Sequence, residues 1–416
     1  MEREAAVPNT IERDLATWTK AELYARAQEL EISGRSAMTK SELAAALAAS
    51  PRKDDVDVDG VVIVGGGYAG VHAARAVMSA GHRATIVDPT GRHDFLTRLA
   101  AVAGGTAPRT DASAALTSFG DDVVIGSMSS VVDGAVTLAD GRMLRSDAVI
   151  VTAGAVPTKP PIPGIEQAWP LRTADDALAL RSRLDDTDRV VIIGGGATGV
   201  QLAGAIAVKH PETKVVLVEA ADTLLAGMGR SVGADAERIL RQRGVDVRLG
   251  AAVDAIDANG IDVGGAEIAG LPIWAAGFAA RADGFGCPVG SSGRVDIDGY
   301  LRVSGWKRTF AAGDVAAHLD DRGDELAMSA QIAVQAGEVA GRNAVALLRG
   351  RPLERANLSH RGWVMDLGGW RGLAEFGPIS LSAPFLDLLP PLLHWGIDVK
   401  HLIDTRGLGG LTDAPG

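Results

Sequence analysis

The chain has 416 residues, which is too long for a single hydrophobic core and suggests two or three domains. Its apolar content of 47% and charged content of 22% are those of an ordinary globular protein, and its net charge of −11 argues against a general affinity for nucleic acid or anionic lipid. The single cysteine, Cys287, excludes a disulfide within the chain and a CxxC redox pair, and it favours a reducing cytoplasm.

The chain shows no targeting or membrane-spanning pattern. Its first residues, MEREAAVPNTIERD, are polar and charged, unlike a secretory signal peptide. Uninterrupted apolar runs stay shorter than the roughly eighteen residues that a membrane span needs. We therefore expect a cytoplasmic protein, with peripheral contact at the inner face of the cell membrane as the alternative.

A short repeat opens the chain. Thr19–Leu23 reads TKAEL and Thr39–Leu43 reads TKSEL, and each is a capping box in which threonine and glutamate satisfy the first amides of a helix. The pattern predicts helices over 21–29 and 41–49, within a small helical module over residues 10–50. The charged, turn-rich residues 51–60 are expected to form a linker.

From Val61 onward, buried strands alternate with helices. The run Val61–Val64 is followed by Gly65, Gly67 and Gly70, an amphipathic helix, and a strand over 84–87 that ends at Asp88. In this fingerprint the first glycine permits a tight turn, the second lets a pyrophosphate approach the backbone, and the third lets helix and strand pack closely. The acid can bind ribose hydroxyls. Two Asp-Gly turns, at 133–134 and 140–141, then predict a hairpin meander before a buried strand in 147–154.

The same order returns from Val190. Gly194, Gly196 and Gly199 follow a second strand, and Glu219 ends the next one. A second meander over 257–268 and a buried strand in 271–277 complete the repeat. One fingerprint alone could be a plain strand–helix turn, but two copies in the same context favour two dinucleotide sites. The sequence therefore predicts an α/β fold with two Rossmann-like domains.

Two further glycine-containing strand ends fit a dinucleotide enzyme. The segment Thr309–Ala316 reads TFAAGDVA, and its Asp314 could bind a flavin or simply cap a helix. The segment Trp274–Gly277 reads WAAG and could equally be an ordinary turn.

The ordered set of motifs resembles the two-dinucleotide-binding-domain flavoproteins, most of all their type II NADH dehydrogenase and apoptosis-inducing-factor-like branch. The resemblance rests on VVIVGGGYAG, VTAGAVP, VVIIGGGATGVQLAG, VVLVEA, GRVDIDGYLRV, FAAGDVA and AQIAVQAG, and it covers roughly 59–350. It implies an FAD-binding domain over 61–175 and 291–350, an inserted NAD(H)-binding domain over 176–290, and a C-terminal region over 351–416 for the acceptor, a membrane or a dimer.

The resemblance also implies roles for individual residues. On FAD it places the first fingerprint, the acid and two later strand ends: Gly65, Gly67, Gly70, Asp88, Gly154 and Asp314. On NADH it places Gly194, Gly196, Gly199, Glu219 and Gly277. Further cofactor-binding residues are Tyr68, Ala69, Gly313 and Ala330. Gln331 and Gln335 would face the electron acceptor and are the candidate catalytic residues.

Two positions depart from the family pattern. Gln201 stands where many members have a glutamate near the nicotinamide, so an acidic role is lost there. Thr97 and Arg98 replace part of an apolar wall after His93-Asp94-Phe95, which leaves the nature of the acceptor open.

The predicted function is oxidation of NADH through FAD, with a quinone as acceptor. Glu219 favours NADH over NADPH, because a carboxylate repels a 2′-phosphate. No metal site is predicted, since the histidines lack ligand spacing. The alternatives are transfer of electrons to a protein carrier, or a non-catalytic nucleotide sensor with a nucleic-acid-binding N-terminal module.

The two ends of the chain leave more than one interpretation open. Residues 1–50 resemble the small N-terminal module of transcription terminator Rho, but their acidic excess makes nucleic acid an improbable ligand and favours a protein partner. A short meander is predicted over 361–378. A helix after Pro390 and Pro391 could anchor the protein at a membrane or dock in a homodimer.

Overall fold

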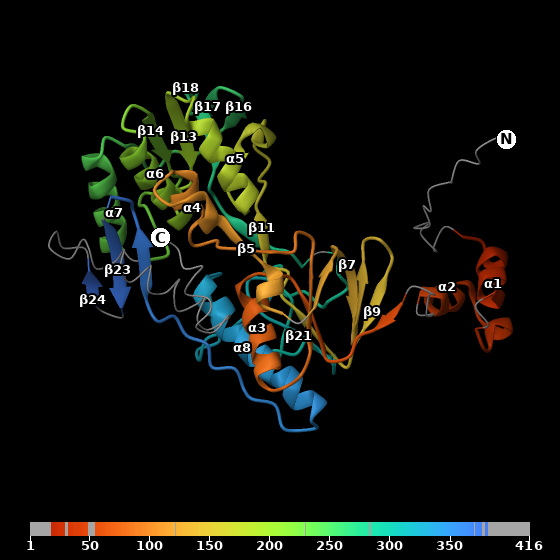
Figure 1. Ribbon diagram of the computed structural model, residues 1–416. Helices are drawn as coiled ribbons and strands as arrows, with labels where there is room; N and C mark the ends of the chain where they lie inside the picture. The colour runs from red at the N-terminus through yellow and green to blue at the C-terminus, as the bar shows by residue number, and fades with distance from the viewer. Residues whose placement is uncertain are drawn as a thin grey trace, which may run out of the picture. The chain divides into compact units, whose positions relative to one another are not determined.

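The computed structural model describes residues 18–29, 32–48, 55–120, 122–228, 230–282, 284–369, 371–376 and 379–381. The chain divides into two compact units, Met1–Val56 and Asp57–Gly416. Figure 1 shows the elements of both units.

The N-terminal unit is a helical pair. Helices α1 (Lys20–Glu29) and α2 (Lys40–Ala48) flank a 3-10 turn, η1 (Arg35–Ala37). Both predicted capping boxes are confirmed: the N–H groups of Thr19 and Thr39 donate to Glu22 Oε2 and Glu42 Oε2, each at 2.7 Å. The unit has its own small core, made of Leu23, Ala27, Leu43 and Leu47.

The second unit begins with a parallel sheet in the order β21-β10-β2-β3-β6. Its strands are β2 (Val61–Val64), β3 (Ala84–Asp88), β6 (Asp122–Ile125), β10 (Ala148–Val151) and β21 (Thr309–Ala311). The side chains of β2 alternate between two cores. Val61 and Ile63 pack with helices α3 (Tyr68–Ser79) and α8 (Ala330–Leu348). Val62 and Val64 pack toward an antiparallel sheet on the opposite face.

That antiparallel sheet has the order β1-β9-β8-β7. Its strands are β1 (Val56–Asp57), β7 (Met128–Val132), β8 (Ala135–Leu138) and β9 (Met143–Arg145). The two Asp-Gly turns join β7 to β8 and β8 to β9, which confirms the predicted meander. Part of the predicted linker is strand rather than loop, because Val58 N–H donates to Arg145 O (2.8 Å) beside β1.

The second unit thus contains two similar halves. Its second half repeats the plan of the first with the parallel sheet β12-β19-β13-β14-β15. Its strands are β12 (Trp169–Pro170), β13 (Arg189–Ile193), β14 (Lys214–Val218), β15 (Asp246–Arg248) and β19 (Leu271–Trp274). One face packs against α5 (Ala174–Leu184), α6 (Ala197–Lys209) and α7 (Arg230–Gln242). The other packs against the antiparallel strands β16 (Ala255–Asp257), β17 (Gly260–Val263) and β18 (Ala266–Ala269). The strands that carry the two fingerprints, β2 and β13, hold equivalent central places in their sheets.

The chain crosses between the halves in two antiparallel strands, β11 (Ala155–Pro157) and β20 (Phe278–Ala280). A segment of the first half also packs on the second half. Strands β4 (Arg92–Asp94) and β5 (Ser113–Ala115) flank helix α4 (Leu99–Ala103), and α4 joins the core formed by α5 and α6. The contact is close, since a Cβ built on Gly104 would lie 2.5 Å from Ala205 Cβ.

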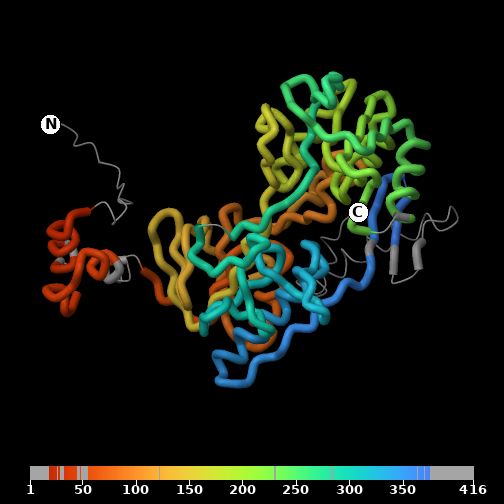
Figure 2. The backbone as a smooth tube through the Cα atoms, turned by 180° about the vertical axis from the view of Figure 1, so that it is seen from behind, coloured from red at the N-terminus to blue at the C-terminus, as the bar shows by residue number. Residues whose placement is uncertain are grey.

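After α8 the chain returns to the second half and forms a three-stranded meander. Its strands are β22 (Trp363–Asp366), β23 (Gly372–Phe376) and β24 (Ile379–Leu381), as predicted for 361–378. Arg243, just after α7, donates to Gly368 O at 2.7 Å, and Leu367 lies against α6, where a Cβ on Gly204 would be 2.3 Å from Leu367 O. Figure 2 follows this return from α8 to the meander. The predicted helix after Pro390 lies outside the described residues.

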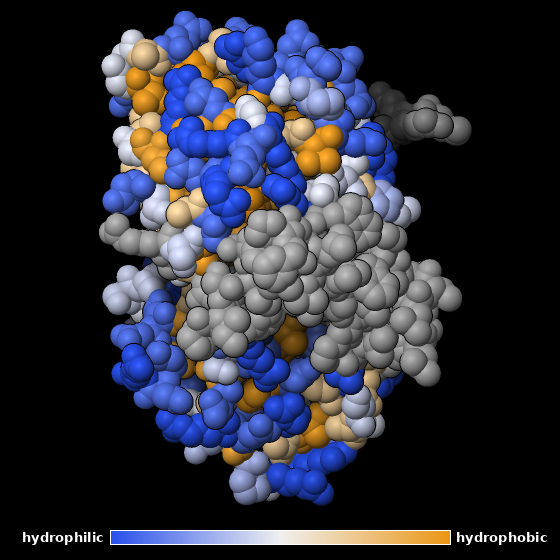
Figure 3. Space-filling view, turned by 90° about the vertical axis from the view of Figure 1, so that its left-hand side faces the viewer, coloured by the Kyte–Doolittle hydropathy of each residue, from blue (hydrophilic) through white to orange (hydrophobic). Residues whose placement is uncertain are grey.

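The face that bears α7 and β23 is mainly hydrophilic where the structure describes it, with hydrophobic residues in small groups (Figure 3). Among the described helices, none is long and apolar enough to cross a bilayer.

Candidate functional site

Each glycine of the first fingerprint has a different physical role. Gly65 has φ 105°, and a Cβ there would lie 2.3 Å from Thr152 O. A Cβ on Gly70 would lie 1.9 Å from Gly65 O, so α3 can approach β2 this closely only with glycine. A Cβ on Gly67 would meet no protein atom within 4 Å. The open position at Gly67 therefore fits a ligand that approaches the backbone at the start of the helix.

The second fingerprint has the same geometry. Gly194 has φ 113°, and a Cβ there would lie 2.8 Å from the Cα of Ala276. A Cβ on Gly199 would lie 1.9 Å from Gly194 O, whereas one on Gly196 would meet nothing within 4 Å. The two copies thus share two close approaches and one open position. The two fingerprints are therefore alike in backbone packing as well as in sequence.

Both strand-end acids are held by the fingerprint itself. Gly66 N–H donates to Asp88 Oδ2 (2.9 Å), and Gly195 N–H donates to Glu219 Oε2 (2.5 Å). Ala221 N–H donates to Glu219 Oε1 (2.8 Å). Each carboxylate is therefore fixed at the end of its strand, beside a helix N-terminus, where free amides and the helix dipole favour an anion such as phosphate.

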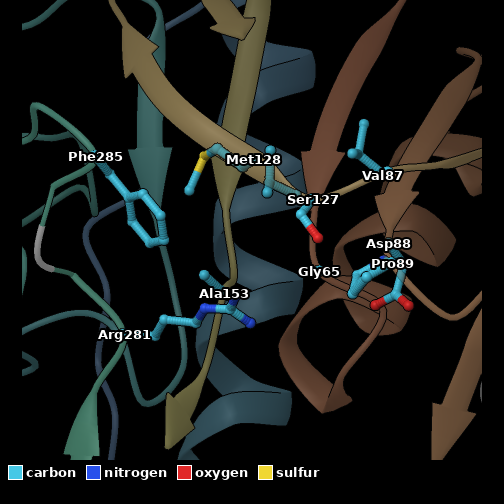
Figure 4. Close-up of a pocket in the computed structure, with 11 residues that line it drawn as sticks. Gly65, Val87, Asp88, Pro89, Ser127, Met128, Ala153, Arg281 and Phe285 are labelled. Carbon is cyan, nitrogen blue, oxygen red and sulfur yellow. The ribbon is translucent and has the colours of Figure 1, made fainter. Parts of the chain in front are cut away.

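A cavity lies at the first fingerprint, and its lining combines residues 64–153 with Arg281 and Phe285, which follow the crossover strand β20 and lie within the range that the sequence assigned to the NAD(H)-binding domain. Figure 4 shows Asp88 and Pro89 on one side and Arg281 and Phe285 on the other, with Met128 between them. The cavity has one acid for hydroxyl groups and apolar walls for a flat ring. Its chemistry and its place beside Gly65 suit the adenosine end of a dinucleotide.

The turn after β21 brings Gly313 and Asp314 beside α3 and α8. Gly313 has φ 78°, and a Cβ there would lie 2.9 Å from Ala69 Cβ. Burial raises the pKa of Asp314, and Arg172 opposes this shift with Nη2 at 3.6 Å from Asp314 Oδ2. Arg172 also lies over the ring of Phe278, 4.9 Å from its centroid. The predicted flavin acid thus has a cationic neighbour that lies between β12 and α5, at the start of the second half.

Gly154 and Gly277 end the strands that precede the two crossovers. Both have positive φ, 72° and 69°. Gly154 O accepts from Arg281 N–H (3.0 Å), which ties it to the wall of the cavity. A Cβ on Gly277 would lie 2.5 Å from the Thr158 hydroxyl. Both turns need glycine for local reasons, so their roles on FAD and NADH stay predictions.

Three of the remaining predicted cofactor residues lie near one another at helix starts. Tyr68 and Ala69 are buried in the first turn of α3, and Ala330 opens α8. Ser329 caps α8 by accepting from Ile332 N–H (3.3 Å). A Cβ on Gly337 would lie 2.2 Å from Ala69 O, so the two helices cross at close range here.

The candidate catalytic residues, Gln331 and Gln335, lie half-buried on the first turns of α8. Both carboxamides bind the backbone of residues that follow the helix: Gln335 Nε2 donates to Ser359 O (3.0 Å), and Gln331 Oε1 accepts from Arg361 N–H (2.5 Å). Their contact with an acceptor stays a prediction.

The two departures from the family pattern have local explanations. Arg98 places no charge on an exposed wall, because it is buried and its Nη2 lies 2.5 Å from Asp111 Oδ2. The Thr97 hydroxyl lies 3.0 Å from the Tyr68 hydroxyl, so its polarity is used within the protein. Gln201 is half-buried in the second turn of α6, close to the fingerprint.

Sequence reasoning missed two buried histidines that contact the turns predicted to bind flavin. His93 is fully buried, and its Nδ1 lies 2.8 Å from Gly66 O in the first fingerprint. His318 Nε2 accepts from Gly313 N–H (3.0 Å). Burial lowers the pKa of His318 to about 4, which keeps the ring neutral and able to accept. The HDF motif could have pointed to His93, whereas no local signal marks His318.

These residues fit two dinucleotides, one at each fingerprint, and they offer no metal chemistry. Within the described ranges, no group of three or more His, Cys, Asp or Glu side chains could hold a metal ion. Cys287 is buried and has a pKa raised to about 11 by burial, so it is a poor thiolate.

Known proteins share this architecture. The chain is 30% identical over 308 residues to the type II NADH:quinone oxidoreductase NdhA of Mycobacterium tuberculosis, a match that covers 61% of this chain and just under two thirds (66%) of that relative. It is 29% identical to an NADH dehydrogenase-like protein of the same organism, over 74% of this chain and 85% of that relative.

Among solved structures, NDH2 of Plasmodium falciparum in complex with NADH has a TM-score of 0.73 at 15% identity. The superposition covers 87% of this chain and 97% of that one, and it shows a common fold. Residues 59–337, which include both fingerprints and the turn at Asp314, match the pyridine nucleotide-disulphide oxidoreductase family over most of the chain. The chain therefore belongs to the pyridine nucleotide-disulphide oxidoreductase family.

Proposed function

We propose that this protein is an FAD-dependent NADH dehydrogenase that passes two electrons to a quinone. The observation that carries the proposal is the pair of matching fingerprints, each with one open glycine and one backbone-held acid. Two dinucleotide sites in one chain suit a cofactor that stays and a nucleotide that turns over. The relatives named as NADH:quinone oxidoreductases support the same pair of substrates.

The first fingerprint would hold FAD and the second NADH. When bound, FAD would supply hydride chemistry, accepting two electrons from NADH and releasing them to the acceptor. The protein's part is to fix both nucleotides. Asp88 and Glu219 bind ribose hydroxyls, the amides at Gly67 and Gly196 face the pyrophosphates, and Asp314 with Arg172 holds the turn beside the flavin.

The electron path ends on a small acceptor rather than on a thiol pair. The family name refers to disulfide chemistry, yet Cys287 is the only cysteine in the sequence, so the chain cannot form a redox dithiol. The relatives with quinone in their names point to a quinone. NADH is preferred to NADPH because the carboxylate of Glu219 would repel a 2′-phosphate.

Contact with a membrane, through residues 351–416, and a homodimer are further parts of this proposal. A quinone acceptor of the membrane pool would favour such contact. Flotation of the protein with anionic vesicles would test it, and sedimentation would test the dimer. The N-terminal module is assigned a protein-interaction role on its acidic excess.

The test is an anaerobic spectrum. Flavin absorbance that NADH bleaches and menadione restores is the expected result. Bleaching without restoration by menadione would transfer the acceptor role to a protein carrier. Purified, folded protein without flavin would refute the proposal and favour a nucleotide-sensing function.

A further inference from the structure

A short strand, β4, contacts both nucleotide-binding halves through neighbouring side chains. His93 Nδ1 lies 2.8 Å from Gly66 O, within the first fingerprint. Asp94 Oδ2 accepts from Ala174 N–H (3.0 Å), which is the first amide of α5 in the second half. Successive side chains of a strand point to opposite sides. One residue step in β4 therefore joins the first fingerprint to the start of α5.

Asp94 is the buried part of this junction. Its other carboxylate oxygen, Oδ1, is buried and has no hydrogen-bond partner among the residues that the structure describes. Burial raises the pKa of Asp94, and the hydrogen bond from Ala174 N–H opposes this shift. The neighbouring pair of Arg92 Nη2 with Asp175 Oδ2 (2.7 Å) is open to solvent, since 69% of the Asp175 side chain is exposed. An exposed pair contributes little, so the polar link between β4 and α5 depends mainly on Asp94.

The start of α5 also reaches the turn that is predicted to bind flavin. Arg172 lies two residues before Ala174, and its Nη2 lies 3.6 Å from Asp314 Oδ2. Within the second half, α5 shares a core with α6, which begins directly after Gly196 of the second fingerprint. A shift of α5 along β4 would therefore change the position of the second fingerprint relative to the turn at Asp314.

The hydrophobic contact between the halves does not fix this position by itself. Helix α4 follows β4 and joins the core of α5 and α6, where the halves meet (Figure 1). Hydrophobic attraction follows the buried area and has no preferred direction. A hydrogen bond does have one, because it weakens steeply as its angle closes. The bond between Asp94 and Ala174 therefore adds a defined register between β4 and α5.

We propose that Asp94 is a positioning residue for hydride transfer, which sets the distance between the nicotinamide and the flavin by fixing α5 to β4. The inference rests on the proposed function, in which NADH loses a hydride and becomes NAD⁺ while the flavin gains the two electrons. Transfer needs the reacting atoms about 3–3.5 Å apart, and a displacement of about 1 Å can lower the rate roughly a hundredfold. Asp94 acts through the placement of the second half rather than through contact with either nucleotide.

The test is anaerobic stopped-flow reduction of the FAD-loaded protein by NADH. Asp94→Ala is expected to slow flavin reduction at saturating NADH by roughly ten- to a hundredfold. The Kd for NADH, taken from the dependence of the rate on NADH concentration, should keep its wild-type value, since the second fingerprint is intact. The long-wavelength charge-transfer absorbance of stacked nicotinamide and flavin should weaken. Asp94→Asn keeps an acceptor for Ala174 N–H, and it should restore both the rate and the absorbance.

Ala174→Pro breaks the same bond from the other side. Proline lacks the N–H and is favoured at the first position of a helix. Thr173 already has the extended conformation that a residue before proline needs (φ −115°, ψ 164°). Ala174→Pro should slow reduction by the same factor as Asp94→Ala, and the double variant should be no slower than either, because both changes remove one interaction. This variant repeats the test if Asp94→Ala does not fold.

The matched control is Asp176→Ala. Asp176 Oδ2 accepts from Arg172 N–H (3.0 Å) and Thr173 N–H (2.8 Å), so it caps the same helix from within the second half. Its loss should lower the Tm and leave the rate of flavin reduction unchanged. A wild-type rate in Asp94→Ala or in Ala174→Pro, or an equal loss of rate in Asp176→Ala, would overturn the proposal. Wild-type protein whose flavin is not reduced by NADH would instead overturn the proposed function.

Discussion

Replacing Gly196 by alanine is expected to weaken NADH binding while the fold stays intact. Gly196 has φ −74° and ψ −176°, an extended conformation that alanine adopts freely, and a Cβ there meets no atom within 4 Å. The gain from a less flexible unfolded chain, about 0.4–1 kcal/mol, offsets the poor capping preference of alanine, which costs about as much. The free energy of unfolding should therefore change little.

The methyl group would stand where the pyrophosphate meets the backbone. Overpacking of this kind costs about 1–3 kcal/mol, which corresponds to a rise in Kd of roughly 5- to 150-fold. The Kd can be measured by titrating NAD⁺ against the flavin spectrum, and the Tm by thermal unfolding.

Gly199→Ala is the matched control, because its Cβ would lie 1.9 Å from Gly194 O and must displace backbone. It should lower the Tm, whereas Gly196→Ala should not. Wild-type affinity for NAD⁺ in Gly196→Ala would refute the assignment of the second fingerprint.

Three further predictions concern an acid, a histidine and an ion pair. Glu219→Ala should raise the KM for NADH about tenfold in a menadione assay, since ribose loses a charged acceptor; an unchanged KM would contradict its role. Burial lowers the pKa of His318 from 6.5 to about 4 in the folded state. The full free energy of unfolding is therefore present above pH 6.5, and it decreases as the pH falls from 6.5 toward 4, because the unfolded chain binds the proton first. The loss at pH 5 should be about 2 kcal/mol in urea unfolding, and His318→Gln, which keeps an acceptor for Gly313, should lack it; parallel curves for both proteins would exclude this explanation. Asp111→Ala removes the carboxylate that pairs with buried Arg98 and should lower the free energy of unfolding by about 3–5 kcal/mol. Asp175→Ala, which breaks the exposed pair with Arg92, should lower it by only about 0–1 kcal/mol. Equal losses in urea unfolding would show that burial does not determine the cost.

Local patterns predicted the repeated parts of the fold. The strand, glycine turn, helix and acid occur in the same register in both halves, because each depends on residues close in sequence. The capping boxes at Thr19 and Thr39 and the two Asp-Gly turns were predictable for the same reason. The ends of helices were less predictable. The amphipathic helix expected after the three glycines of the first fingerprint begins at Tyr68, before the third glycine, and ends at Ser79.

Contacts between distant segments could not be predicted. Nothing near His318 indicates that its ring accepts from Gly313, and the letters at 97 and 98 suggested a polar wall where the structure has internal pairs. The backbone partners of Gln331 and Gln335, at Ser359 and Arg361, depend on the path of the chain after α8, and no periodicity in residues 351–362 indicates that path. In each case the partner is fixed by tertiary packing rather than by the local sequence.

The position of the meander has a consequence for biosynthesis. Met365, Leu367 and Leu373 belong to the same core as α5, α6 and α7, although the last strand of that sheet ends at Trp274. Domains generally fold from the N-terminus as the ribosome releases them. Here the half that carries the second fingerprint leaves the ribosome before the residues of the meander that complete its core. We therefore expect a nascent chain that ends before β22 to lack a stable nucleotide site at the second fingerprint.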